Sequence, residues 1–132
     1  MSVNDVSEWI KFAEGDIRTA EWTLKDDAPS CHTICFLCQS AAEKYLKALL
    51  ISKGWKLKKD HDLVFLANIL GNEFGIDSSK ILECLIVLND YIVESRYPGE
   101  IPFEMFDITM AKEALDAVKK IKDWVKKHYP SK

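Results

Sequence analysis

The chain has 132 residues, is 48% hydrophobic and 30% charged, and carries a net charge of −3; this is typical of one soluble globular domain, here expected over residues 1–132, and excludes a disordered chain. The first residues have neither the basic nor the apolar region of a secretory signal, and no run approaches the ~18 apolar residues of a membrane span, so we expect a cytoplasmic protein with no membrane partner. In that compartment the four cysteines should remain thiols, which excludes a disulfide framework.

The first two predicted elements are amphipathic helices. Apolar residues recur at helical spacing over about residues 4–26, and the first helix stops before Pro29. Ser30 is a suitable N-cap for a second helix, which continues to about Lys53, ahead of Gly54. The face of the first helix that we expect to be buried consists of Trp9, Phe12, Ala13, Ile17, Ala20 and Leu24.

The segment CHTICFLC, residues 31–38, begins the second helix with a C-x3-C-x2-C spacing. Radical-SAM enzymes hold an iron–sulfur cluster with this spacing, so a metal site is one interpretation. The ligands of such a cluster converge from a loop, whereas Cys31, Cys35 and Cys38 lie along one apolar stripe of a continuous helix. Free cysteine is also among the most buried residue types. We therefore expect three core residues and no metal, and His32, which points about 100° away from Cys31, adds no ligand.

Charge is segregated along the chain. Residues 44–61 carry six lysines and a single acid, Asp60. Such a block can form a local patch that attracts phosphate, or it can be a solvated helix face, which is the simpler interpretation of any one block. Lys44 points away from the cysteine stripe and is expected in solvent.

Three further helices complete the predicted fold. Each is bounded by residues that cap or break helices: Asp60 and Gly75 for the third, Asp77 and Pro98 for the fourth, and Asp107 or Thr109 for the start of the fifth. An irregular stretch, RYPGEIPFEMF, separates the fourth helix from the fifth. Strand signals are almost absent, so the sequence predicts an all-α fold, an antiparallel up-and-down bundle of four to five helices.

Three segments in order resemble the HEPN domain family of small helical proteins. They are QSAAEKYLKALL at 39–50, KKDHDL at 58–63 and YIVESRYP at 91–98, preceded by the amphipathic segment WIKFAEGDIRTAEWTL. The resemblance covers nearly the whole chain. It implies a helical bundle that forms a homodimer through helix faces and acts as the partner of a minimal nucleotidyltransferase.

Some members of that family are RNA-cleaving toxins, whose motif is an arginine, four to six residues and a histidine. Arg96 matches the arginine, but the histidine positions are occupied by Ile101, Pro102 and Phe103. Metal-independent RNA cleavage needs groups that take up and release protons near neutral pH, which histidine does and arginine does not. The resemblance therefore argues against an enzyme with this ribonuclease site, although a ribonuclease that uses Arg96 stays open as the weakest alternative.

Five residues are candidates for nucleotide or RNA binding. Arg96 can bind phosphate or stabilise a helix C-terminus, and Tyr97 can stack on a base or cover the end of the bundle. Glu43 and Lys47 match an E-x-x-x-K that lies near the site in the resembled family, but a plain i, i+4 ion pair also explains their spacing. His61 is either a residue at the start of the third helix, which we favour, or a weak phosphate donor.

Two classes of function follow. The first is a HEPN-type module that binds nucleotide or RNA and works with a nucleotidyltransferase in a toxin–antitoxin-like or regulatory pair; the second is a purely structural interaction bundle. No cofactor is expected. Dimerisation is expected because the apolar stretch IPFEMF, residues 101–106, is hard for a single small bundle to cover.

Overall fold

The computed structural model describes residues 5–91 and 102–129. These residues form five α-helices: α1 (Val6–Leu24), α2 (Cys31–Ser52), α3 (Leu63–Phe74), α4 (Leu82–Asn89) and α6 (Ile108–His128). Two short 3-10 helices, η1 (Ser79–Ile81) and η2 (Phe103–Met105), precede α4 and α6. The described residues include no strand, so the predicted all-α bundle is confirmed. Along the same residues, no helix has the length and apolar composition that crossing a membrane requires.

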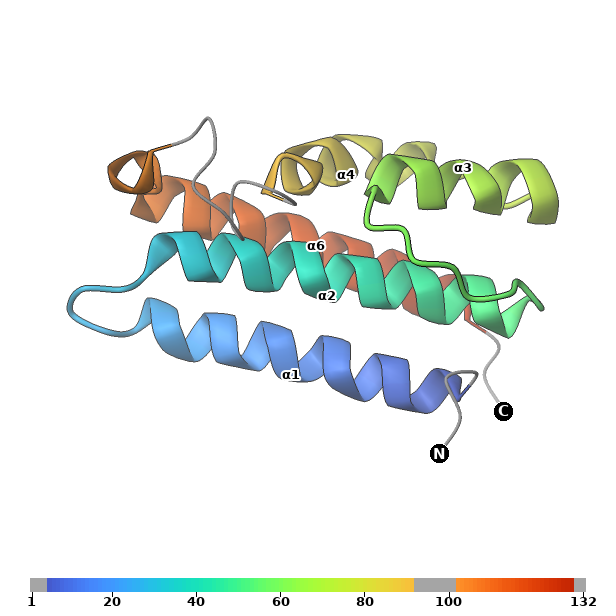
Figure 1. Ribbon diagram of the computed structural model, residues 1–132, viewed down its shortest axis with the longest axis horizontal. Coiled ribbons are helices and arrows are strands. Elements are labelled where there is room, and N and C mark those ends of the chain that lie inside the picture. The colour runs from blue at the N-terminus through green and yellow to red at the C-terminus, as the bar shows by residue number, and fades with distance from the viewer. Residues whose placement is uncertain (1–4, 92–101, 130–132) are drawn as a thin grey trace.

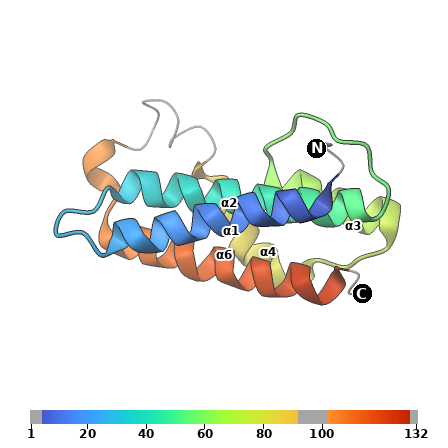
Figure 2. The same ribbon diagram turned by 90° about the horizontal axis from the view of Figure 1, so that it is seen from below.

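The central element of the bundle is α2. It lies beside α1 and α6 as the middle one of three long helices, while α3 and α4 cover the side of the bundle away from α1 (Figures 1 and 2). The connection from α2 to α3 is not a tight hairpin, because residues 53–62 run back along α2 before α3 begins (Figure 1). Consequently α3 runs in the same direction as α2, and the end of this connection reaches the middle of α2.

Aspartates cap the starts of α1, α3 and α6. The Asp62 carboxylate accepts hydrogen bonds from the N–H groups two and three residues further on, so Asp62 is the N-cap of α3. The prediction of Asp60 for this cap was wrong; its carboxylate instead accepts a hydrogen bond from the N–H of Asp62. Asp107, and not Thr109, caps α6. Ser30 precedes α2 as predicted, but its side chain makes no capping hydrogen bond and pairs with the Thr33 hydroxyl at 2.8 Å.

The region between α3 and α4 follows the prediction in outline. Gly75 ends α3 in the left-handed conformation, φ 68°, which glycine adopts without strain. The Asp77 carboxylate accepts from the Ser79 N–H and begins the helical turn that leads into α4. The predicted end of this helix at Pro98 lies outside the described residues.

The cysteine stripe of α2 lies in the core, as predicted. Cys35 and Cys38 are fully buried and Cys31 is 8% exposed. Burial raises the pKa of the Cys35 thiol to about 12 and also raises the pKa of Cys38, so both stay protonated near neutral pH. In the described part of the chain, no three His, Cys, Asp or Glu side chains are placed to share a metal ion.

One residue of the predicted apolar face of α1 does not face the core. Ala13, Ile17 and Ala20 are buried as expected, but the Phe12 side chain is 59% exposed. Phe12 directly precedes Ala13, and neighbouring residues on a helix differ in direction by about 100°. The buried stripe is therefore narrower than the apolar pattern of the sequence suggested.

Burial of the α2 thiols predicts their reactivity. In native protein at pH 8, the thiol reagent DTNB should modify Cys84, which is half-buried, faster than the buried Cys31, Cys35 and Cys38, because thiolate and access are both required. The released thionitrobenzoate gives the number and rate of the thiols that react, and all four react once the protein is unfolded in guanidinium. Cys84→Ala is the control and should remove the fast phase; modification of Cys35 and Cys38 at the rate of Cys84 would contradict the placement of the stripe.

Candidate functional site

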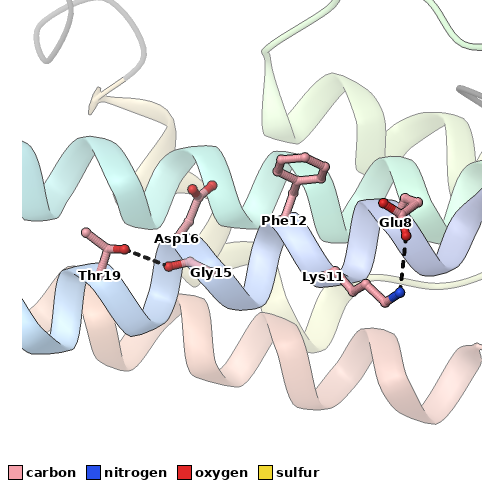
Figure 3. Close-up of a pocket in the computed structure, with 6 residues that line it drawn as sticks. All are labelled: Glu8, Lys11, Phe12, Gly15, Asp16 and Thr19. Atoms are coloured by element: carbon pink, nitrogen blue, oxygen red, sulfur yellow. Dashed lines mark hydrogen bonds and ion pairs between the residues drawn. The ribbon is translucent and has the colours of Figure 1, made fainter. Parts of the chain in front are cut away.

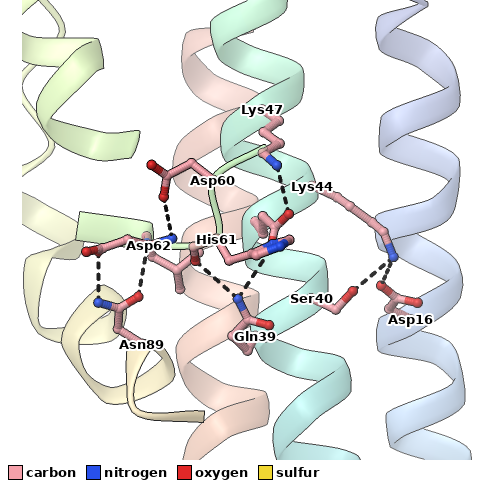
Figure 4. Close-up of polar contacts among 11 residues, drawn as sticks. Asp16, Gln39, Ser40, Lys44, Lys47, Asp60, His61, Asp62 and Asn89 are labelled. Carbon is pink, nitrogen blue, oxygen red and sulfur yellow. Dashed lines mark hydrogen bonds and ion pairs between the residues drawn. The ribbon is translucent and has the colours of Figure 1, made fainter. Parts of the chain in front are cut away.

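Three polar side chains lie one turn apart on α2 and are buried. Gln39, Glu43 and Lys47 occupy positions i, i+4 and i+8, and their exposed fractions are 0, 9 and 4%. The Lys47 ammonium lies 2.9 Å from Oε2 of Glu43 (Figure 4). Because isolated buried charges are strongly disfavoured, this pairing is what allows both side chains inside the bundle.

The returning connection brings a histidine to the same point. Nδ1 of His61 lies 2.8 Å from Oε1 of Glu43, across 18 residues of sequence. Nε2 of Gln39 lies 3.4 Å both from that Glu43 oxygen and from the backbone oxygen of His61 (Figure 4). Glu43 thus uses one oxygen for Lys47 and the other for His61, and Gln39 joins the helix to the connection. We call Gln39, Glu43, Lys47 and His61 the α2 polar cluster.

Local conformation holds the connection in place. Gly54 leaves α2 with φ 96°, a value that glycine adopts freely. Trp55 then packs into the core with 7% of its surface exposed, and its backbone N–H donates to the Leu50 carbonyl. At the other end, the Asn89 amide of α4 donates to the Asp62 carboxylate and accepts from the Leu63 N–H (Figure 4). His61 therefore lies next to a fixed helix start.

The six lysines of residues 44–61 divide into two groups. Lys47 belongs to the α2 polar cluster, and Lys44 makes a 2.6 Å ion pair with Asp16 of α1. The prediction that Lys44 lies free in solvent was wrong, since its side chain is 25% exposed and links α1 to α2. The other four are exposed, and none makes an ion pair with a residue that the structure describes; they are Lys53, Lys56, Lys58 and Lys59.

The cluster fixes the chemistry of the histidine ring. An ionised carboxylate only accepts hydrogen bonds, so Glu43 holds the proton of the neutral His61 ring on Nδ1. The other ring nitrogen, Nε2, then carries no proton. The His61 side chain is 42% exposed, and Nε2 makes no hydrogen bond to a described residue. This arrangement presents an oriented nitrogen at the end of the connection that carries the four exposed lysines.

A separate hollow lies on the outer face of α1. It has a volume of about 360 Å³ and is shown in Figure 3. All residues that line it belong to this one helix; they are Glu8, Lys11, Phe12, Gly15, Asp16 and Thr19. Glu8 and Lys11 pair with each other at 3.2 Å and Asp16 pairs with Lys44, so the charged groups of the hollow already have partners.

Of the five predicted site residues, the structure brings three together. Glu43 and Lys47 form the predicted i, i+4 pair, but the pair is buried and shares its carboxylate with His61, which the sequence did not indicate. Arg96 and Tyr97 lie outside the described residues. Sequence reasoning missed Gln39, although its position one turn before Glu43 on the same face was a usable signal.

Comparison with known proteins places the chain in a family. A model of the HEPN domain matches residues 6–128, which is most of the chain. The chain belongs to the HEPN domain family. The crystal structure of an archaeal HEPN homologue superposes with a TM-score of 0.75 at 30% sequence identity, covering 95% of this chain and 98% of that one. Among curated proteins, no relative matches.

In this HEPN domain, two of the sequence segments that carry the resemblance meet in space. Glu43 and Lys47 come from QSAAEKYLKALL, and His61 comes from KKDHDL. The 2.8 Å contact between Nδ1 of His61 and Oε1 of Glu43 joins the two segments directly. The α2 polar cluster is therefore the point at which separate segments of the HEPN sequence come together.

The buried pair can be tested through stability. Lys47→Met should lower the free energy of unfolding by about 3 kcal/mol, because it leaves the Glu43 carboxylate buried without its cation. The double variant Glu43→Leu/Lys47→Met should recover at least half of this loss, since apolar residues replace both charges. Urea denaturation followed by circular dichroism measures both.

The matched control for this prediction is Lys120→Met. Lys120 pairs with Asp116 at the same i, i+4 spacing, but the two side chains are 64% and 68% exposed, so the loss should stay below about 1 kcal/mol. An equal loss in Lys47→Met and Lys120→Met would show that burial of the Glu43–Lys47 pair has no energetic consequence.

Proposed function

We propose that this HEPN domain binds the phosphates of nucleotides or RNA on the face formed by residues 53–61, which lie along α2. It acts as a homodimer and as the partner of a minimal nucleotidyltransferase, in a toxin–antitoxin-like or regulatory pair. Membership of the HEPN family supports the class of ligand and of partner. The proposal concerns binding and not cleavage, because residues 102 and 103, where the family's ribonuclease motif can place its histidine, are proline and phenylalanine.

The observation that carries the binding proposal is the group of exposed lysines on the connection that ends at His61. Lys53, Lys56, Lys58 and Lys59 are exposed and lie within seven residues of each other. The nearby Glu43 carboxylate is neutralised by Lys47 and so does not cancel their charge. A concentrated positive surface attracts phosphate locally even on a protein with a net charge of −3. Salt weakens this attraction by screening it.

Dimerisation has a separate support. In the stretch predicted to need cover, Phe103 and Met105 are 66% and 62% exposed, whereas Phe106 is 7% exposed and packs in the core. Ile108, at the start of α6, is 40% exposed. Adjacent exposed apolar side chains of this size favour contact with another protein surface. A purely structural role as an interaction bundle is the second candidate, and this apolar surface is the observation in its favour.

The lysine group predicts the salt dependence of RNA binding. The variant with Lys53, Lys56, Lys58 and Lys59 changed to Gln should bind a short single-stranded RNA at least tenfold more weakly than wild type at low salt. The slope of log K against log salt should fall by about 0.7 for each phosphate that the variant no longer neutralises. Fluorescence anisotropy with labelled RNA over a range of salt concentrations measures both.

The control removes the same charge elsewhere. Lys25, Lys80, Lys112 and Lys127 are exposed and lie outside residues 53–61, so changing these four to Gln gives the same net charge with little expected effect on RNA affinity. If both quadruple variants weaken RNA binding equally, only overall charge matters. If wild type binds no RNA and no nucleotide, the structural candidate replaces the binding proposal.

The dimer is tested by mass in solution. At micromolar concentration the protein should sediment as a dimer, and Phe103→Ser/Met105→Ser should shift it toward the monomer because two large apolar side chains no longer supply the core of the interface. Trp22→Ser is the control, since Trp22 is 72% exposed but belongs to α1. A monomeric mass of the wild type, measured by analytical ultracentrifugation, contradicts this part of the proposal.

A further inference from the structure

The orientation of His61 has a consequence for what the lysine surface binds. Glu43 holds Nδ1 of the ring at 2.8 Å, and the carboxylate itself is fixed by Lys47 and Gln39. The backbone of His61 is held as well, through its carbonyl and Gln39. The ring is therefore anchored on its buried side, and any ligand of this histidine meets Nε2.

Protonation changes what Nε2 can do. In the neutral ring with its proton on Nδ1, Nε2 is a hydrogen-bond acceptor and suits no unprotonated phosphate oxygen. When Nε2 takes up a proton, it becomes a charged N–H donor, and a hydrogen bond between a cationic donor and an anion is about twice as strong as a neutral one. Binding of a phosphate dianion at this nitrogen is therefore coupled to the uptake of one proton from solution.

We propose that Glu43 and His61 form a proton-linked site for a phosphate monoester, the group carried by a mononucleotide or by a phosphorylated RNA end. This rests on the proposed function and names the phosphate that the His61 surface prefers. A monoester carries a charge of about −1.5 to −2 near pH 7 and three acceptor oxygens, enough for Nε2 and two neighbouring lysines, such as Lys58 and Lys59. An internal phosphodiester carries a single negative charge and two free oxygens. Glu43 is a positioning residue, because it acts through the imidazole.

The pH range of the effect follows from the groups around the ring. Glu43 contacts the ring and Lys47 contacts Glu43. The charged residues next along the chain are Lys58, Lys59, Asp60 and Asp62, and Asp90 follows Asn89, which binds the Asp62 carboxylate. Carboxylates and ammonium groups ordinarily titrate outside pH 6.5–8.5, whereas imidazole ordinarily titrates near 6.5. The second ionisation of a phosphate monoester lies near pH 6 and is nearly complete over most of this range. Because the bound dianion favours the protonated ring, affinity falls as pH rises through the range.

The experiment compares AMP, adenosine and a short RNA with and without a 5′-phosphate, by isothermal titration calorimetry on the full chain from pH 6.5 to 8.5. For the phosphorylated probes, affinity should fall by up to about tenfold per pH unit, the limit for one linked proton. In buffers of different ionisation enthalpy, the heats should report uptake of up to one proton per phosphate bound. Adenosine and the unphosphorylated RNA should show neither effect.

Two variants separate the effect of the His61 ring on binding from its effect on the fold. His61→Asn places an amide where Nδ1 contacts Glu43 and carries no group at Nε2, so the connection keeps its anchor while the pH dependence disappears. Glu43→Gln should also flatten the pH profile, because the amide no longer fixes the proton on Nδ1. His128→Gln is the control, since Nδ1 of His128 is bonded to the Trp124 carbonyl in the last turn of α6, and it should leave the profile unchanged.

The outcomes distinguish this inference from the proposed function. Proton-linked binding of AMP alone identifies a mononucleotide, and of the phosphorylated RNA alone an RNA end; either supports the site. Equal affinity for the RNA with and without its phosphate, with the lysine dependence intact and AMP unbound, overturns the site but leaves the proposed function. A pH dependence that survives in His61→Asn also overturns it. The absence of all RNA and nucleotide binding in wild type overturns both.

Discussion

The central position of α2 is the constraint on which the rest of the structure depends. This helix packs against α1, α3, α4 and α6, so most of its surface is removed from water. Apolar and small side chains can be buried without a polar partner, and the three cysteines in the first half of α2 belong to this group. A polar side chain on the same helix must find its partner inside the protein, because an unpaired buried charge is strongly disfavoured.

The α2 polar cluster is how the bundle satisfies that condition. Lys47 and Glu43 neutralise each other, and the second oxygen of Glu43 holds a histidine that arrives from outside the helix. Replacing such a pair by apolar residues is often neutral or stabilising, so stability alone does not explain its presence. The pair instead determines where other groups lie. It fixes the His61 ring and, with it, the course of the connection that carries four exposed lysines.

The connection between α2 and α3 links packing to surface chemistry. A tight turn at Gly54 would have left the lysines at one end of the bundle; instead Trp55 enters the core and the chain returns along α2. The positive surface that results is local, on a chain whose net charge is negative. Local charge of this kind directs anions to one face without making the whole protein bind them.

The helices and the family could be predicted from the sequence, because both rest on local patterns. Periodic apolar residues, Gly75 and Asp107 place helix faces and helix ends through interactions within a few residues. The segments QSAAEKYLKALL and KKDHDL indicated the HEPN family by their order. Where two nearby aspartates could serve the same local role, as Asp60 and Asp62 do before α3, the pattern selected the wrong one, since capping depends on where the backbone turns.

The sequence by itself therefore determined that this protein is a helical bundle of the HEPN family with the three cysteines of α2 in the core. Only the tertiary structure decided that Lys44 pairs with Asp16, that Phe12 faces solvent, and that His61 meets Glu43 across 18 residues. These contacts join segments whose separation along the chain says nothing of their distance in space. A histidine and a glutamate become a pair only when the fold buries the carboxylate and brings the ring within hydrogen-bond distance of it.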